Sequence, residues 1–155
     1  AASDVYKRQH EDHLRAGRLY AAAGKARAAT KSFARCERLS PGHLAAAHTA
    51  VDAVPTKAHA ERLLNAVDSA GEVILANGRF QLEPMGSPPV SLDTVLASLE
   101  RAAASVPALA DRCRRERERL DDQRAAIVAG EQAANARLQS ALDSLQPKHD
   151  YYQYG

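Results

Sequence analysis

The side chains in this sequence that could bind a metal ion or act as nucleophiles are a few histidines and cysteines. His10 and His13 are one helical turn apart with two acidic residues between them, a spacing that could aim two imidazoles at one metal ion. A zinc site needs further ligands, and no cluster of Cys or His supplies them. Cys36 and Cys113 are isolated, and packing explains them more simply than catalysis. We therefore expect no metal and no cofactor.

Sequence motifs of common catalytic sites are missing. The chain has no GxGxxG, GxxxxGK[ST], GxSxG or HExxH, so standard phosphate-binding loops and hydrolase sites are not expected. We predict that the chain is not an enzyme. A net charge of +2 and an aromatic content of 5% argue against nucleic-acid binding.

The composition also bears on membranes and on the compartment. No apolar run approaches the roughly 18 to 20 residues that span a bilayer, so we expect no membrane segment. The first residues lack a signal peptide's hydrophobic region, and the two cysteines form no disulfide framework. A reducing, cytoplasmic location is the simplest interpretation.

The elements that must position any site are predicted to be helices. Apolar and small residues recur with helical spacing over residues 10–23, 25–39 and 43–54. Gly24 ends the first of these, and Pro41 follows the second because proline disfavours helical geometry in the residue before it. Much of the apolar content is alanine, so contacts between helices should be close and the core built of small side chains.

Residues 56–76 allow two interpretations. An apolar stripe with spacings of three and four runs through Leu75 and favours one helix with Asn77 and Gly78 as its C-cap. The alternative takes residues 73–75 and 79–82 as strands around that Asn-Gly turn, which is a strong hairpin signal. We favour the helix because the stripe is unbroken.

The second half of the chain follows a Pro/Gly-rich segment. Residues 78–90 are predicted to be a linker, and Ser91 caps a short helix over residues 91–105. A long helix is expected over residues 108–145, ending before Pro147 and leaving a flexible, Tyr-rich tail at residues 146–155.

The long helix has a partial coiled-coil pattern. One seam position recurs every seven residues with small or apolar side chains: Cys113, Leu120, Ile127, Ala134 and Ala141. The other is half charged: Ala110, Arg117, Arg124, Glu131, Leu138 and Leu145. The prediction is one narrow apolar edge, with self-association through the helix at residues 108–145.

One set of residues near the start has a recognisable spacing. These are Gly17, Tyr20, Gly24, Ala29, Phe33, Cys36 and Pro41. At these positions residues 10–43 resemble a tetratricopeptide repeat, in which small residues allow two helices to touch, aromatics fill the space beside them and a proline marks the exit. The family's early Trp and Leu positions hold His13 and Ala16 here.

The resemblance implies an all-α fold with helical hairpins over residues 10–77, the second of them degenerate, followed by the long helix. It also implies a groove lined by the first helix, where Glu11, Leu14, Arg18 and Ala21 would face a bound peptide. Residues 14–38 hold seven basic residues and one acid, so acidic partners are favoured.

The first nine residues resemble a translated laboratory sequence. Residues 4–9 read Asp-Val-Tyr-Lys-Arg-Gln, which is similar to the translation of a transposon end used in sequencing libraries. We interpret residues 1–9 as a non-native tag on a sequence of transcriptomic or metagenomic origin, with more of the natural protein upstream of His10. A native polar arm is the alternative.

The expected function is protein binding, as a scaffold or adaptor that forms the C-terminal fragment of a larger repeat protein. Two alternatives stay open. One is a trafficking module of the microtubule-interacting-and-trafficking type, whose first two helices are similar. The other is the regulatory end of an enzyme whose catalytic domain lies upstream.

Overall fold

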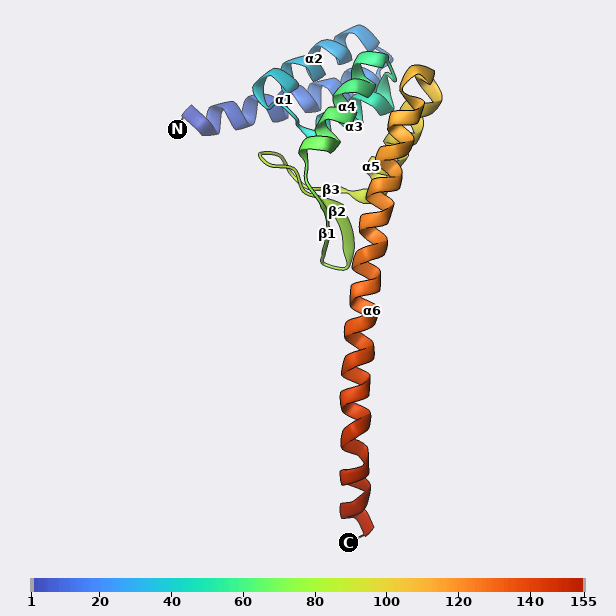
Figure 1. Cartoon of the computed structure of the whole chain (residues 1–155). Helices are drawn as coiled ribbons and strands as arrows, with labels where there is room; N and C mark the ends of the chain where they lie inside the picture. The colour runs from blue at the N-terminus through green and yellow to red at the C-terminus, as the bar shows by residue number, and fades with distance from the viewer. Residues whose placement is uncertain (1, 155) are drawn as a thin grey trace.

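The chain forms a helical head from which one long helix projects (Figure 1). The structure is a computed structural model that describes the backbone of residues 2–154 and the side chains of residues 9–145. Its elements are, in order, α1 (Ala2–Ala22), α2 (Ala26–Leu39), α3 (Leu44–Ala53), α4 (Lys57–Ser69), β1 (Val73–Ala76), β2 (Arg79–Leu82), β3 (Val90–Ser91), α5 (Leu92–Ser105), the 3-10 helix η1 (Pro107–Leu109) and α6 (Ala110–Tyr154). The predicted class, all-α with helical hairpins before a long helix, is confirmed, with a small sheet added.

The first hairpin closes at a glycine and packs at another. Gly24 has φ +75°, a left-handed conformation that ends α1 at little cost for glycine. Gly17 faces the buried ring of Phe33, and a Cβ at Gly17 would lie 2.5 Å from that ring. The close approach predicted for the two helices is therefore present, although Tyr20 is 40% exposed and does not fill the space beside them.

Side chains and prolines delimit the next two helices. The Nδ1 atom of His43 accepts a hydrogen bond from the Ala46 N–H at 3.1 Å and caps α3. The Thr56 hydroxyl accepts one from the His59 N–H at 3.2 Å and caps α4 after Pro55. α3 and α4 pack together as the second predicted hairpin.

The prediction of one helix over residues 56–76 is wrong, and the alternative hairpin is correct. α4 ends at Ser69, and Gly71 has φ +86°. Asn77 and Gly78 both have positive φ, 53° and 72°, as a type I′ turn requires. β1 then pairs antiparallel with β2, with Val73 opposite Leu82. The apolar stripe misled because a short apolar run fits a buried helix and a strand equally well.

The predicted linker at residues 78–90 does not divide the chain. It contains β2, and it leads into β3, which pairs with β2 through Leu82 opposite Val90. Both of these side chains lie in the main core, which takes residues from α3, α4, α5 and α6 as well. Residues 44–120 therefore share one core, because the proline-rich loop returns to the sheet instead of leaving it.

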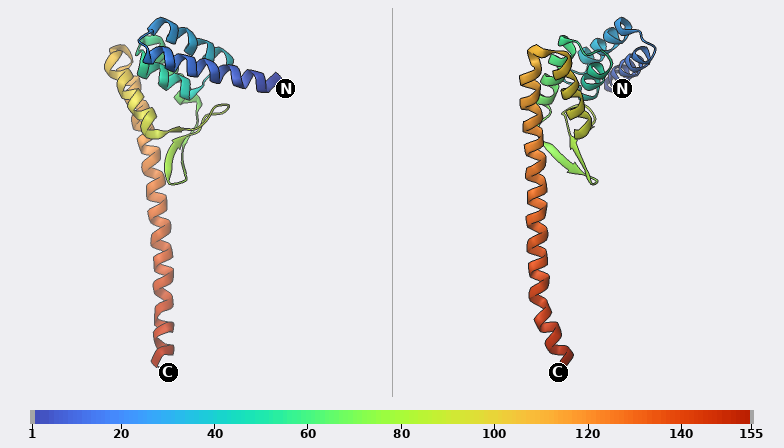
Figure 2. Two further views of the ribbon diagram at one scale, coloured as in Figure 1. Left: turned by 180° about the vertical axis from the view of Figure 1, so that it is seen from behind. Right: turned by 90° about the vertical axis from the view of Figure 1, so that its right-hand side faces the viewer.

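Only the first part of α6 belongs to this core. Cys113 and Leu120 are fully buried and Ile127 is partly buried, so one predicted seam position packs within the chain. The Gln123 side chain accepts a hydrogen bond from the Val73 N–H at 2.8 Å, which joins β1 to α6. Figure 2 shows the hairpin beside α6 in two further views.

The ends of the chain differ from prediction in their secondary structure. α6 continues through Pro147 to Tyr154, past the end expected before that proline. α1 begins at Ala2, so the hexapeptide at residues 4–9 is helical. The side chains of residues 146–154, including the tail tyrosines, lie outside the described part. The origin of the tag stays a prediction.

The contact between Gly17 and Phe33 predicts a selective loss of stability. We expect Gly17→Ala to lower the free energy of unfolding by about 1–3 kcal/mol, because the added methyl meets a buried ring. The matched control is Gly130→Ala in α6, where a Cβ has nothing within 4 Å and helix propensity gains up to about 1 kcal/mol. Urea unfolding measures both. Equal effects would contradict the close packing of the hairpin.

Candidate functional site

Of the four α1 residues expected to line a groove, only Leu14 is buried. Leu14 is 8% exposed and lies in a second core cluster with Ala46 of α3, and Ala21 packs against the same cluster. The Arg18 guanidinium donates to the Thr49 hydroxyl at 3.5 Å, so it too is directed toward α3. Glu11 is exposed. The groove prediction is wrong for Leu14, since α3 packs on this side of α1. It stays a prediction for the other three residues.

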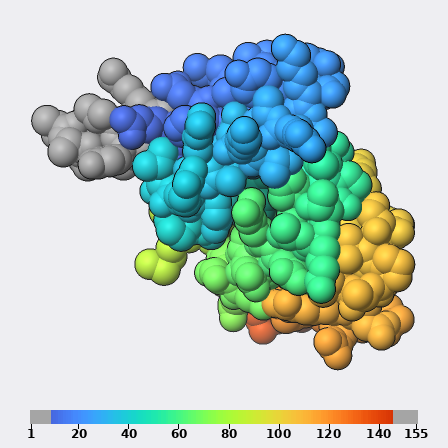
Figure 3. Space-filling model, turned by 90° about the horizontal axis from the view of Figure 1, so that it is seen from above, coloured from blue at the N-terminus to red at the C-terminus, as the bar shows by residue number. Residues whose placement is uncertain are grey.

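A basic hollow lies instead between α2 and α4. A depression of about 440 Å³ opens there, and it is lined by Lys31, Ala34, Arg35, Glu37, Arg38 and Arg62. In the space-filling view the cyan surface of α2 borders the green surface that includes α4 (Figure 3). We call Lys31, Arg35, Arg38 and Arg62 the basic patch.

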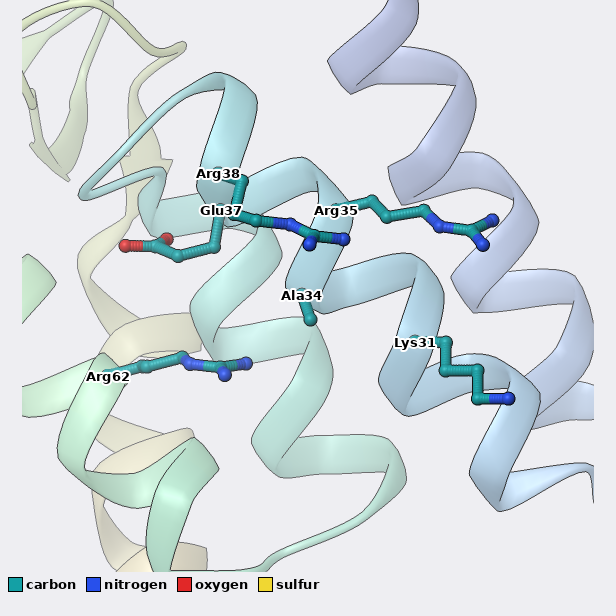
Figure 4. A pocket seen from close by; sticks show the side chains of 6 residues that line it. All are labelled: Lys31, Ala34, Arg35, Glu37, Arg38 and Arg62. Atoms are coloured by element: carbon teal, nitrogen blue, oxygen red, sulfur yellow. The ribbon is translucent and has the colours of Figure 1, made fainter.

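The patch is assembled by helix geometry. Lys31, Arg35 and Arg38 are spaced by four and three residues, which places them on one face of α2. The opposite face of α2 carries Phe33 and Cys36 into the core, so the cations must face solvent. Arg62 comes from α4, and Figure 4 shows its guanidinium extending from the opposite side of the hollow.

The positive charge of the patch is not neutralised locally. Within residues 9–145, none of its four cations forms a salt bridge. The one acid at the hollow, Glu37, accepts a hydrogen bond from the Gly42 N–H at 3.0 Å and points away from the guanidiniums in Figure 4. In α6, by contrast, five of the seven arginines form salt bridges, as Arg124 does with Asp121 at 2.7 Å.

The patch extends toward α1. A second depression of about 250 Å³ shares Arg35 and Arg38 with the first and is completed by Gln9, His13 and Leu39. The two hollows therefore form one continuous surface. A shallow, extended and basic surface suits a chain segment better than a small molecule, which is usually enclosed.

Part of this surface was visible in the sequence. Residues 14–38 carry an excess of basic residues, but this range mixes patch residues with Arg15, which pairs with Asp12 at 3.7 Å, and Arg18, which contacts α3. The spacing of three and four residues within α2 was the available signal. Arg62 had none, because its place depends on how α4 packs beside α2.

A polar cluster at the edge of the core joins α3 to α5 without forming a catalytic triad. The Ser98 hydroxyl donates to Asp52 Oδ1 at 2.8 Å, and Arg101 binds the same carboxylate. His48 Nδ1 is 3.6 Å from Asp52 Oδ2. In serine hydrolases the histidine lies between serine and acid, whereas here the acid is central and Ser98 has no base. The cluster holds the two helices together.

The cysteines have the environment of packing residues. Burial, with a smaller contribution from Glu37, raises the pKa of the Cys36 thiol to about 11. Burial also raises the pKa of Cys113. A nucleophilic cysteine needs a lowered pKa, whereas the pKa of both thiols is raised.

The histidine pair considered for metal binding is separated by packing. His10 is buried and stacks edge-on against His43, with ring centroids 5.2 Å apart, while His13 borders the smaller hollow. Among the residues that the structure describes, no three His, Cys, Asp or Glu side chains are grouped to hold a metal ion. In that same part of the chain, no helix is both long and apolar enough to cross a membrane.

Comparisons with known proteins give no match. No protein-family model matches the chain, and no curated protein or solved structure is significantly similar to it.

The cap at His43 predicts a pH-dependent stability. Burial, reinforced by His10, lowers the pKa of His43 from 6.5, so the unfolded chain takes up a proton first as the pH falls. The free energy of unfolding should have its full value above pH 6.5 and should decrease as the pH falls below 6.5. Protonation at Nδ1 would also remove the acceptor for Ala46.

We expect His43→Asn, which keeps a cap acceptor without titrating, to lose less stability than the parent between about pH 7.5 and 5.5. Urea unfolding at both pH values measures this. Burial also lowers the pKa of His48, and that contribution is present in both proteins. Identical pH dependence would contradict the role of His43.

Proposed function

We propose that the chain is a protein-binding module of a scaffold or adaptor, and that it holds an acidic segment of a partner on the basic patch. The observation that carries the proposal is the grouping of four cations around one hollow without a salt bridge in the described part of the chain. Unpaired like charges repel one another, so an anionic ligand relieves a cost that the free protein bears.

The spacing of the cations suits an extended acidic peptide. Residues three or four apart on a helix have Cβ atoms about 5–6 Å apart. Alternate residues of an extended chain are about 6.6 Å apart. Acidic side chains at alternate positions can therefore reach Lys31, Arg35 and Arg38 in turn, and the arginines can bind carboxylates through two hydrogen bonds. Arg62 would hold the segment from the α4 side.

The architecture favours stacked hairpins over the alternative trafficking module. α3 contributes Ala46 and Ala50 to the core beneath α1 and α2, and Leu44 and Val51 to the main core. A self-contained three-helix domain would have no second core on its third helix. The tetratricopeptide-like resemblance of residues 10–43 remains part of the proposal, supported by the close contact at Gly17. The placement of this chain in a longer protein is also part of the proposal.

A peptide-binding assay tests the proposal with a matched pair of variants. The probe is a fluorescent peptide of alternating Glu and Ser, and its anisotropy is titrated with the full chain at low salt. We expect Arg35→Glu/Arg38→Glu to weaken binding by about 10-fold or more, roughly 1.4 kcal/mol. The control Arg115→Glu/Arg137→Glu changes the net charge equally at exposed arginines of α6 and should alter affinity by less than about 2-fold.

A second peptide separates charge from shape. The same sequence with Gln in place of Glu should not bind, and binding of the Glu peptide should weaken as salt rises. Equal loss of affinity in both double variants would show that net charge alone attracts the peptide. That result would contradict a site at the patch.

A further inference from the structure

The distal part of α6 is a helix without a packing partner in the described structure. Every residue from 128 to 145 is exposed, and Leu138 and Leu145 are 61% and 60% exposed. Figure 1 shows this part of the helix projecting away from the head. Eighteen residues span about 27 Å, and most of the stability of helices in proteins comes from packing of an apolar face.

The exposed side chains continue a seam that is already an interface. Cys113, Leu120 and Ile127 pack into the main core, and the same seven-residue repeat continues through Ala134 and Ala141. The alternate seam position supplies Leu138 and Leu145. Where the head ends, the seam becomes available to a second chain.

We infer that residues 134–145 of α6 pair antiparallel with the same segment of a second copy. The sizes of the seam side chains indicate both that the partner is a second copy and that the two helices are antiparallel. In an antiparallel coiled coil, the seam position that holds the leucines in one helix faces the seam position that holds the alanines in the other. Leu138 therefore meets Ala141 of the copy, and Leu145 meets Ala134. Every layer then combines one large and one small side chain, which fills the space evenly. A parallel pair alternates Leu-Leu layers with Ala-Ala layers and leaves gaps at the alanines.

Charge supports the same direction. Glu131 occupies a seam position. Parallel pairing would bring the two Glu131 carboxylates together inside the interface, where like charges are costly. In the antiparallel register each Glu131 lies about 17 residues, or roughly 25 Å, from its copy. The repulsion is thereby removed.

The pairing separates the two heads. With Leu138 facing Ala141, the Ile127 positions, where the seam leaves each head, lie about 38 Å apart along the axis at 1.5 Å per residue. Each head keeps its own basic patch, since the patch is on α2 and α4. The dimer would be a rod with a basic patch at each end. Formation of the dimer does not depend on what the basic patch binds.

Sedimentation equilibrium of the full chain tests the dimer. We expect a dimer at tens of micromolar and a monomer for Leu138→Glu/Leu145→Glu. The control Gln132→Glu/Ser140→Glu adds the same charge on the other side of the helix and should stay dimeric. These positions are all exposed, so unfolding of the head should be unchanged in both variants. A monomeric parent, or equal behaviour of the two variants, would overturn the inference.

Disulfide trapping tests the direction. An Ala134→Cys chain is mixed with a Leu145→Cys chain in a buffer of oxidised and reduced glutathione. The antiparallel register predicts a cross-link between the two different chains, because these positions face each other. Each chain alone should not cross-link, since like positions would be about 16 Å apart. Efficient cross-linking of the Ala134→Cys chain with itself would show a parallel pair.

Discussion

The fold depends on a helix that is buried from two sides. α3 contributes Leu44, Ala47 and Val51 to the main core beneath α4, α5 and α6. It also contributes Ala46 and Ala50 to the smaller core that holds α1 and α2. Small side chains on one face let neighbouring helices approach closely, so the first hairpin packs against the same ten-residue helix that α4 and α5 pack against. Its cap at His43 and the carboxylate of Asp52 secure it to its surroundings.

This arrangement decides which surfaces are left for partners. Because α3 covers the face of α1 that carries Leu14, that face is core and not groove. α2 buries Phe33 and Cys36 on one side and presents Lys31, Arg35 and Arg38 on the other. The surface that results is a shallow, basic and open hollow. Such a surface binds through charge and spacing, with little buried apolar area.

The packing of the main core also explains why the environment changes along α6. Its first turns complete the main core through Cys113 and Leu120, and Arg124 pairs with Asp93 of α5 at 3.1 Å. In the described part of the chain, residues 128–145 leave the head with their seam exposed. A continuous helix thus combines an intramolecular interface with one available for assembly.

Local patterns in the sequence determined α1, α2, α3 and α5, the stops at Gly24 and Pro41 and the contact of Gly17 with Phe33, because each depends on residues close in the chain. They also determined the apolar seam of α6. Tertiary structure alone decided that residues 73–76 form a strand, that Leu14 is buried and that Arg62 joins the basic patch. These outcomes depend on which distant segments cover a given face, and a periodic pattern records that a face is apolar or charged without recording its partner.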